Sequence, residues 1–390
     1  MARRRTERPA KKFGTPLYCA VWPKGDYAFV AGGGGKSSSG IANKIVTVHR
    51  EDGQISGAAA GSVTVQDAPM RMALQPQETT LAVALGDGGI LKFSVARDKD
   101  DVPVLQQLQG KAEEVFAKIG VVECMAFSSD GRILGVSTAD GSLTIYDWQT
   151  GRALNMLSAE HGLNSTIRDL SFSPAHMDKV LAAVADNGTC SLWAWEKRLQ
   201  ITLLDLPKEL KGGAFSKARW SQDGTATLYT VVNLKAREEG HLLLYKQDEE
   251  GELQLQRQSL LCRKMVSAFD LSHSGQMCGA GTMDGDAAIF SLPSGKRLKQ
   301  SPDAHMVFVT AVAFSNGEDS LLSASADASA WLTGMPAQRG AQVSSVTTVM
   351  LLLLVIMLCA VAAAFWTGAD AQILAALQRI GVKPAAHTEL

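Results

Sequence analysis

One pattern of strands and turns recurs seven times along residues 13–335, and this repeat constrains the fold more than any other feature. A copy contains an apolar strand, a polar turn, a second strand, a tight turn and a third strand, most clearly in Val121–Leu154. The first strand of each copy ends near a large apolar residue, and these residues stand 43 to 53 positions apart: Trp22, Leu74, Phe127, Phe172, Trp220, Leu271 and Phe314. Period-2 strands repeating at this length are typical of propeller blades. The sequence therefore predicts an all-β, seven-bladed β-propeller over residues 13–335.

Two short strings in the third repeat resemble WD repeats. Tyr146-Asp147-Trp148 resembles the Trp-Asp end of a WD strand, and Glu160-His161-Gly162 stands where these repeats carry a Gly-His pair. After Trp331 little sequence remains for an outer fourth strand of the last blade. We expect the segment near Phe13 to supply that strand and so close a WD-repeat-like ring.

The overall composition excludes several classes of protein. Apolar residues make up 46% of the chain and the net charge is −1, which argues against disorder and against a nucleic-acid-binding domain. Residues 1–12 form a basic tail of net charge +5. The six cysteines show neither paired spacing nor histidine partners at zinc-binding spacing. We expect them to be reduced and mostly buried.

A long uncharged segment follows the repeats. After a polar linker at residues 336–345, residues 346–366 are 21 almost entirely apolar residues. At 1.5 Å per residue such a helix spans a hydrocarbon core of about 30 Å, whereas a buried core helix of this length normally keeps a polar face. The sequence thus predicts a single transmembrane helix after the propeller, followed by a short tail at residues 367–390.

The orientation of this span is not decided by its flanking charges, because Arg339 precedes it and Arg379 and Lys383 follow it. Without an N-terminal signal, the propeller would be made before the span and would fold in the cytosol. The short tail would then be lumenal, where its last four residues, HTEL, resemble a retrieval signal of the endoplasmic reticulum. We therefore expect an endoplasmic-reticulum membrane protein with a retrieval receptor as one partner.

The connection between the second and third strands of the first repeat is anomalous. Other repeats use tight turns there, such as Asp87-Gly88 and Asp284-Gly285, but the first inserts the segment GGGGKSSSGIAN at 32–43. Its glycines allow positive φ angles and leave backbone groups exposed. Exposed carbonyl oxygens can coordinate a cation, and exposed N–H groups can bind an anion. Gly35-Lys36-Ser37 matches the end of a phosphate-binding P-loop, but Val30 replaces the first glycine and a strand follows instead of a helix. A flexible linker and a structured recognition loop remain the alternatives.

This segment contains four glycines, a short insert and then G-I-x-N-K. The pattern resembles the corresponding loop of the endoplasmic-reticulum exchange factors of the COPII coat, the prolactin regulatory element-binding protein family. The resemblance extends to the propeller, the single span and the short tail. It implies a loop that engages a Sar-type small GTPase, with Asn43 and Ile41 as the exchange residues. It also implies that a potassium ion is held by the glycine backbone, without an organic cofactor; the matching positions are Gly32, Gly33, Gly34, Gly35 and Gly40.

Two functions from different classes fit these features. The first is a guanine-nucleotide exchange factor that loads a Sar-type GTPase and starts COPII coat assembly in transport from the endoplasmic reticulum to the Golgi. Such a factor catalyses GDP release without covalent chemistry and so is not an enzyme in that sense. The alternative is a membrane-tethered WD-repeat scaffold without exchange activity. A third role, as a nuclear transcription regulator, conflicts with the predicted span.

Overall fold

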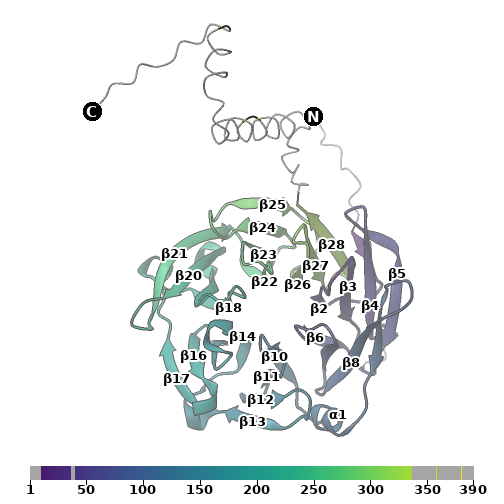
Figure 1. Ribbon diagram of the computed structural model, residues 1–390, viewed down its shortest axis with the longest axis horizontal. Helices are drawn as coiled ribbons and strands as arrows, with labels where there is room; N and C mark the ends of the chain where they lie inside the picture. Colours follow the sequence, from purple (N-terminus) through teal and green to yellow (C-terminus); the bar gives the residue numbers. More distant parts are fainter. Residues whose placement is uncertain (1–9, 37–39, 336–356, 358–378, 380–390) are drawn as a thin grey trace. The chain divides into compact units, whose positions relative to one another are not determined.

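The computed structural model describes residues 10–36, 40–335, 357 and 379. Residues up to Met335 form one compact unit, in which seven antiparallel four-stranded sheets surround a central channel (Figure 1). The seven-bladed all-β propeller predicted from the repeat is confirmed.

Each blade runs from an inner strand at the channel to an outer strand at the rim. Blade one consists of β2 (Cys19–Val21), β3 (Tyr27–Gly32), β4 (Lys44–Glu51) and β5 (Gln54–Thr64), and blade two of β6 (Pro69–Leu74), β7 (Thr80–Leu85), β8 (Ile90–Arg97) and β9 (Pro103–Gln107). Blade three consists of β10 (Val122–Phe127), β11 (Ile133–Thr138), β12 (Leu143–Asp147) and β13 (Ala153–Leu157), and blade four of β14 (Ile167–Phe172), β15 (Val180–Ala185), β16 (Cys190–Ala194) and β17 (Leu199–Leu203).

The remaining three blades follow the same plan. Blade five consists of β18 (Ala214–Trp220), β19 (Thr227–Leu234), β20 (Glu239–Gln247) and β21 (Leu253–Cys262). Blade six consists of β22 (Val266–Leu271), β23 (Met277–Thr282), β24 (Ala287–Ser291) and β25 (Arg297–Ser301). Blade seven consists of β26 (Val309–Phe314), β27 (Ser320–Ser325), β28 (Ser329–Gly334) and β1 (Lys11–Lys12). Short helices occupy connections between strands: α1 (Lys111–Phe116), η1 (Ala159–His161), η2 (Pro174–His176), η3 (Trp195–Lys197), η4 (Lys208–Leu210) and η5 (Lys235–Arg237).

The N-terminal segment closes the ring by supplying the outer strand of blade seven. Lys11 pairs with Ala330 and Lys12 with Ser329, and the Phe13 N–H donates to the Ala328 carbonyl at 2.8 Å. The expected closure is confirmed, but β1 begins two residues earlier than the predicted propeller boundary. Two lysines can form this strand because an outer edge strand has to bury little apolar surface.

The hydrophobic core lies between neighbouring blades. Phe29 of blade one packs in one cluster with Leu81 and Phe93 of blade two, while Val30 packs with Leu322 of blade seven. Successive residues of β3 thus point into opposite blade interfaces, as the alternation of a strand requires. Both faces of each sheet are covered in this way, and this mutual burial is what a single blade lacks.

The predicted transmembrane segment at 346–366 lies outside the described residues, except for Met357. Among the helices that the structure does describe, none has the length and apolarity needed to span a bilayer. The five cysteines within the described ranges are free thiols, and four of them are buried, as expected.

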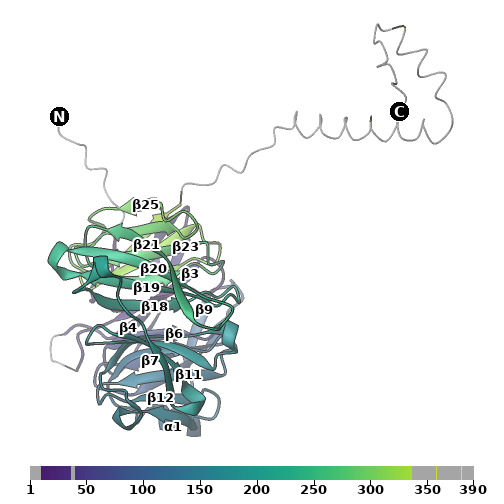
Figure 2. The same cartoon turned by 90° about the vertical axis from the view of Figure 1, so that its left-hand side faces the viewer.

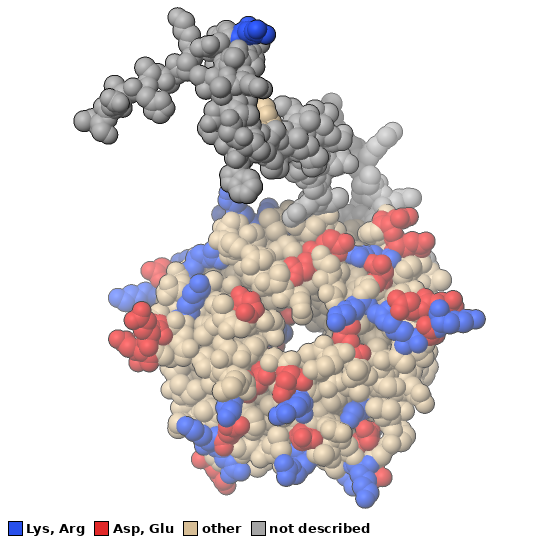
Figure 3. Space-filling view, viewed as in Figure 1, with Lys and Arg blue, Asp and Glu red and all other residues tan. Residues whose placement is uncertain are grey.

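Charged side chains are mixed on the face of the propeller shown in Figure 3. Lysine and arginine alternate there with aspartate and glutamate around the rim and the channel opening. Figure 2 shows the same blades edge-on, with the turns between strands forming two opposite faces. In an antiparallel blade the connection between the second and third strands and the connection to the next blade lie on the same face. The glycine-rich loop of blade one therefore shares a face with the β25–β26 connection.

Candidate functional site

The glycine-rich segment joins the last residue of β3 to the first residue of β4. Gly32 and Lys44 are paired in the ladder, so the loop opens directly from the end of a regular hairpin. Residues 37–39 lie outside the described residues, whereas both arms of the loop are described. Gly35 and Gly40 have φ angles of +77° and +71°, a conformation that favours glycine.

Two of the glycines are required by close packing at the base of the loop. A Cβ atom on Gly32 would lie 1.8 Å from the Pro16 carbonyl oxygen. A Cβ atom on Gly33 would lie 2.1 Å from Oδ1 of Asn43. A larger residue at either position would therefore displace the opposite arm of the loop or the supporting segment at Pro16. These two glycines are required by close packing and not only by backbone flexibility.

Asn43 closes the base of the loop from the opposite arm. Its Oδ1 accepts a hydrogen bond from the Gly35 N–H at 3.0 Å, and its Nδ2 donates to the Gly35 carbonyl at 3.1 Å. The Asn43 carbonyl accepts from the Val65 N–H at 3.0 Å, and the residue is 9% exposed. The side-chain amide thus points inward and binds the loop to itself.

Ile41 takes the opposite orientation, with 38% of its surface exposed two residues before Asn43. The next residue, Ala42, is held from behind by Thr15, whose Oγ1 donates to the Ala42 carbonyl at 3.0 Å. The arm is therefore fixed by Thr15 and Asn43 while an apolar side chain faces outward. Nothing in the sequence near Thr15 indicates this supporting role, because the contact joins positions far apart along the chain.

The other arm is connected to blade two through charged groups. Lys36 Nζ lies 3.0 Å from Asp87 Oδ2, and both side chains are 60% exposed. The hydrogen bond to Asp87 raises the pKa of Lys36. Asp87 is positioned by its own N–H, which donates to Oδ2 of the buried Asp67 at 2.7 Å. The tight turn of blade two thus provides an anchor for the loop of blade one.

The P-loop alternative does not fit the structure. The strand β4 follows the loop, as the sequence indicated, so no helix N-terminus faces the Gly35-Lys36 backbone. Lys36, which would contact phosphate in a P-loop, is paired with Asp87 instead. The two-point closure by Asn43 also distinguishes the described arms from a flexible linker.

The base of this loop contains oxygen atoms of the kind that bind hard cations. The glycine backbone offers carbonyl oxygens, and the carboxylate of Asp67, which is 2% exposed, lies beside Gly35. Oxygen ligands of this kind are what hard cations and K⁺ select. Within the described ranges, no group of three His, Cys, Asp or Glu residues could hold a metal ion. A potassium ion held here would therefore depend on the backbone and Asp67.

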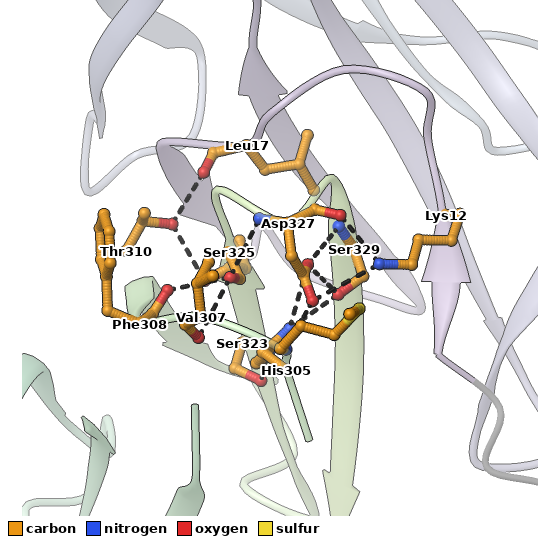
Figure 4. Close-up of polar contacts among 12 residues, drawn as sticks. Lys12, Leu17, His305, Val307, Phe308, Thr310, Ser323, Ser325, Asp327 and Ser329 are labelled. Carbon is orange, nitrogen blue, oxygen red and sulfur yellow. Dashed lines mark hydrogen bonds and ion pairs between the residues drawn. The ribbon is translucent and has the colours of Figure 1, made fainter. Parts of the chain in front are cut away.

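A buried polar network marks blade seven as a WD-type blade (Figure 4). His305, which is 4% exposed, makes contacts of 2.8 Å to both Ser323 Oγ and Ser329 Oγ, and its Nδ1 lies 3.8 Å from Asp327. Burial lowers the pKa of His305 to about 4, although the Asp327 carboxylate opposes this shift. The Gly-His equivalent predicted from the sequence is His161, which lies in the connection that follows blade three but contacts Ser158 at 3.2 Å instead.

Charged residues also meet beside the central channel. Arg219 donates to Asp169 at 2.6 Å and lies 3.6 Å from Asp270, whose pKa burial raises to about 6. The neighbouring cavity has a volume of about 450 Å³ and is lined in part by Arg219 and Asp270. Because these charges are paired between neighbouring inner strands, we interpret them as structural bonds between blades.

The blades and the His305 network define the class of protein, a WD-repeat β-propeller. Residues 116–147 match the family model of the WD domain, G-beta repeat. The chain is 28% identical over 312 residues to SEC12-like protein 2 of Arabidopsis thaliana, covering 77% of this chain and 74% of that protein. It is 25% identical over 353 residues to the guanine nucleotide-exchange factor SEC12 of Rattus norvegicus, covering 77% of this chain and 81% of that protein. The chain therefore folds as a WD-repeat propeller and is similar in sequence to SEC12 and SEC12-like proteins.

Proposed function

We propose that this protein is a guanine-nucleotide exchange factor for a Sar-type small GTPase. The observation that carries the proposal is the blade-one loop, in which Asn43 closes the base on Gly35 and Ile41 is left exposed. The name of the rat relative, a guanine nucleotide-exchange factor, supports the same function.

Exchange requires no covalent step. The factor must bind the nucleotide-free GTPase more tightly than the loaded form, because only differential affinity shifts such an equilibrium. In a GTPase the switch segments are ordered by phosphate and Mg²⁺, so a rigid loop that occupies their place promotes nucleotide release. In this mechanism Ile41 makes the apolar contact with the GTPase, and Asn43 is a positioning residue that holds the loop in its binding shape.

The bound ion belongs to the same proposal. A potassium ion would be held by the backbone at Gly32, Gly33, Gly34, Gly35 and Gly40, with Asp67 close by. Bound there, it would stiffen the loop electrostatically. If this is right, the melting temperature of the protein will be higher in KCl than in choline chloride at equal ionic strength, because a ligand of the folded state stabilises it. Equal melting temperatures in the two salts would contradict the ion site.

The location of this activity is proposed from the sequence beyond the propeller. The span at residues 346–366 would anchor the propeller on the cytosolic face of the endoplasmic reticulum, and HTEL would be read by a retrieval receptor. GTP loading at that membrane would start COPII coat assembly.

The exchange function is tested with the full-length protein in liposomes. A Sar-type GTPase carrying fluorescent GDP is added with excess GTP, and the rate of fluorescence loss is measured. We expect the wild-type protein to accelerate release and Ile41→Ala to reduce the maximal rate. The matched control is Ile201→Ala, since Ile201 lies on the outer strand β17 and is 50% exposed.

The scaffold alternative gives a different outcome in the same assay. If wild-type protein binds the GTPase but leaves the rate of GDP release unchanged, the protein is a tethered scaffold and the exchange proposal is wrong. If Ile41→Ala and Ile201→Ala reduce exchange equally, the loop is not the exchange element.

A further inference from the structure

An exposed apolar cluster lies on the same face of the propeller as the blade-one loop. It consists of Met283, Met306, Val307 and Phe308, which are 46%, 84%, 40% and 42% exposed, and we call it the blade-seven patch. Met283 belongs to the β23–β24 turn, and the other three lie in the connection from β25 to β26. Exposed apolar clusters of this kind, with methionine and an aromatic residue, are typical of protein-binding surfaces.

The backbone under the patch is held firmly. The Met306 N–H donates to Asp327 Oδ2 at 2.8 Å, and the Phe308 carbonyl accepts from Ser325 Oγ at 2.9 Å (Figure 4). The preceding residue, His305, donates its N–H to the Gly285 carbonyl at 3.0 Å. A rigid backbone presents apolar side chains to a partner at a low cost in conformational entropy.

The patch is connected to the blade-one loop through one short segment. Thr310 Oγ1 donates to the Leu17 carbonyl at 2.9 Å, so the chain just after the patch contacts residues 15–17 (Figure 4). The same segment supports the loop, because Thr15 bonds Ala42 and Pro16 lies against Gly32. Blade seven and the loop are thus braced by the same buried segment, residues 15–17, and both lie on one face of the propeller.

Charged pairs border the patch. Lys264 lies 2.9 Å from Asp284, which follows Met283 in the chain, and Lys12 lies 3.5 Å from Asp327, which accepts from the Met306 N–H. An apolar centre with a polar rim is the usual anatomy of a protein–protein interface. The arrangement favours a protein partner over a lipid surface, since lysines that are already paired with aspartates attract anionic headgroups weakly.

We propose that the blade-seven patch is a second contact for the GTPase, which binds an apolar segment of it while the blade-one loop displaces the nucleotide. This inference rests on the proposed exchange function, because the partner is the same. A switch segment that has lost its contacts with phosphate and Mg²⁺ is mobile, and burial of its apolar residues against Met306 and Phe308 would hold it. The patch therefore contributes affinity, whereas the loop contributes the rate of release.

The test separates these two contributions with the full-length protein in liposomes. Met306→Asp is preferred because Met306 is the most exposed member, and Phe308→Ser is a second variant in case the first disturbs the fold. We expect either variant to raise the GTPase concentration needed for half-maximal exchange by about tenfold, as loss of a central interface contact does. The maximal rate should change by less than about twofold.

The control is Leu199→Asp, which places the same charge on an exposed apolar residue of β17 that is 55% exposed. If wild-type protein is active and both patch variants retain the wild-type half-maximal concentration, the patch proposal is wrong and the exchange function stands. If wild-type protein does not accelerate release, the exchange function fails, and this inference fails with it. Loss of self-association in Met306→Asp, or loss of binding to added protein-free vesicles, with GTPase binding unchanged, would assign the patch to a second copy or to a membrane and overturn the proposal.

Discussion

The side-chain amide of Asn43 makes a two-point contact with the backbone of Gly35, accepting from its N–H at 3.0 Å and donating to its carbonyl at 3.1 Å. Gly35 and Asn43 are eight positions apart in the sequence, so this contact closes the loop at its base. The closed loop carries the exposed Ile41. An asparagine is suited to this contact because its amide has both a donor and an acceptor.

Asn43→Asp keeps the shape of the side chain but removes the donor. The carboxylate would face the Gly35 carbonyl, and two acceptors in contact repel each other, so the loop should open. Leaving a buried polar group unpaired costs about 1–3 kcal/mol. We expect the maximal exchange rate to fall by about tenfold or more, measured by release of fluorescent GDP. The matched control is Asn187→Asp in the tight turn of blade four, and an equal loss in both variants would contradict the positioning role of Asn43.

Gly33→Ala tests the same contact from the other arm. The new methyl group would overlap Oδ1 of Asn43, which is 2.1 Å from the Cβ position, so either the amide or the strand end must move. We expect a loss of about 1–3 kcal/mol in the free energy of unfolding and a strong loss of exchange activity. Gly120→Ala is the control, because nothing lies within 4 Å of its Cβ position. Thermal denaturation measured by circular dichroism should show a lower melting temperature for Gly33→Ala alone.

The ion pair between Lys36 and Asp87 should contribute little to stability. Both side chains are 60% exposed, and the attraction in such pairs is largely screened by water and salt. We expect Asp87→Asn to leave the melting temperature within about 2 °C of wild type and to lower exchange mainly at low salt, where the attraction is least screened. Exchange rates measured between 20 and about 300 mM salt check this expectation. A salt-independent loss would mean that Asp87 acts through something other than this pair.

His305 should make the stability of the propeller depend on pH. Its pKa of about 4 in the fold lies below the usual value of 6.5, so the unfolded chain binds more protons between these two values. The contribution of His305 to the free energy of unfolding is therefore fully present above about pH 6.5. It decreases by on the order of 2–3 kcal/mol as the pH falls toward 4. Urea denaturation at several pH values measures the slope. His305→Gln should be less stable at pH 7 but should show a shallower slope, and an unchanged slope would exclude His305 as its source.

The proposed membrane topology predicts a pattern of glycosylation. The sequons at Asn164 and Asn187 should remain unmodified in cells, because the propeller would be cytosolic. Ala386→Asn creates an Asn-His-Thr sequon in the tail, which should acquire a glycan in the lumen. Treatment with a glycosidase, followed by electrophoresis, detects each glycan as a change in mobility. A glycan on Asn164 or Asn187 would reverse the orientation.

The fold was largely predictable because its signal is repeated. Leu74, Phe127 and Phe172 each end an inner strand, as their in-phase spacing indicated, and β1 closes the last blade. The WD signature was harder to place. His161 stands in the expected connection, but the buried network forms at His305, where its serine partners are contributed by β27 and β28.

The sequence by itself determined the number of blades, their strand order and the position of the unusual loop, because these depend on local periodicity and on turn residues close together in the chain. The tertiary structure decided that Asn43 faces inward, that Lys36 is paired with blade two and that Met306 and Phe308 lie on the same face as the loop. The orientation of Asn43 depends on how the two arms of the loop close on each other, and the pairing of Lys36 depends on how blade two packs against blade one. The position of the blade-seven patch is decided when the ring closes and brings blade seven against residues 15–17, and no short-range pattern encodes that contact.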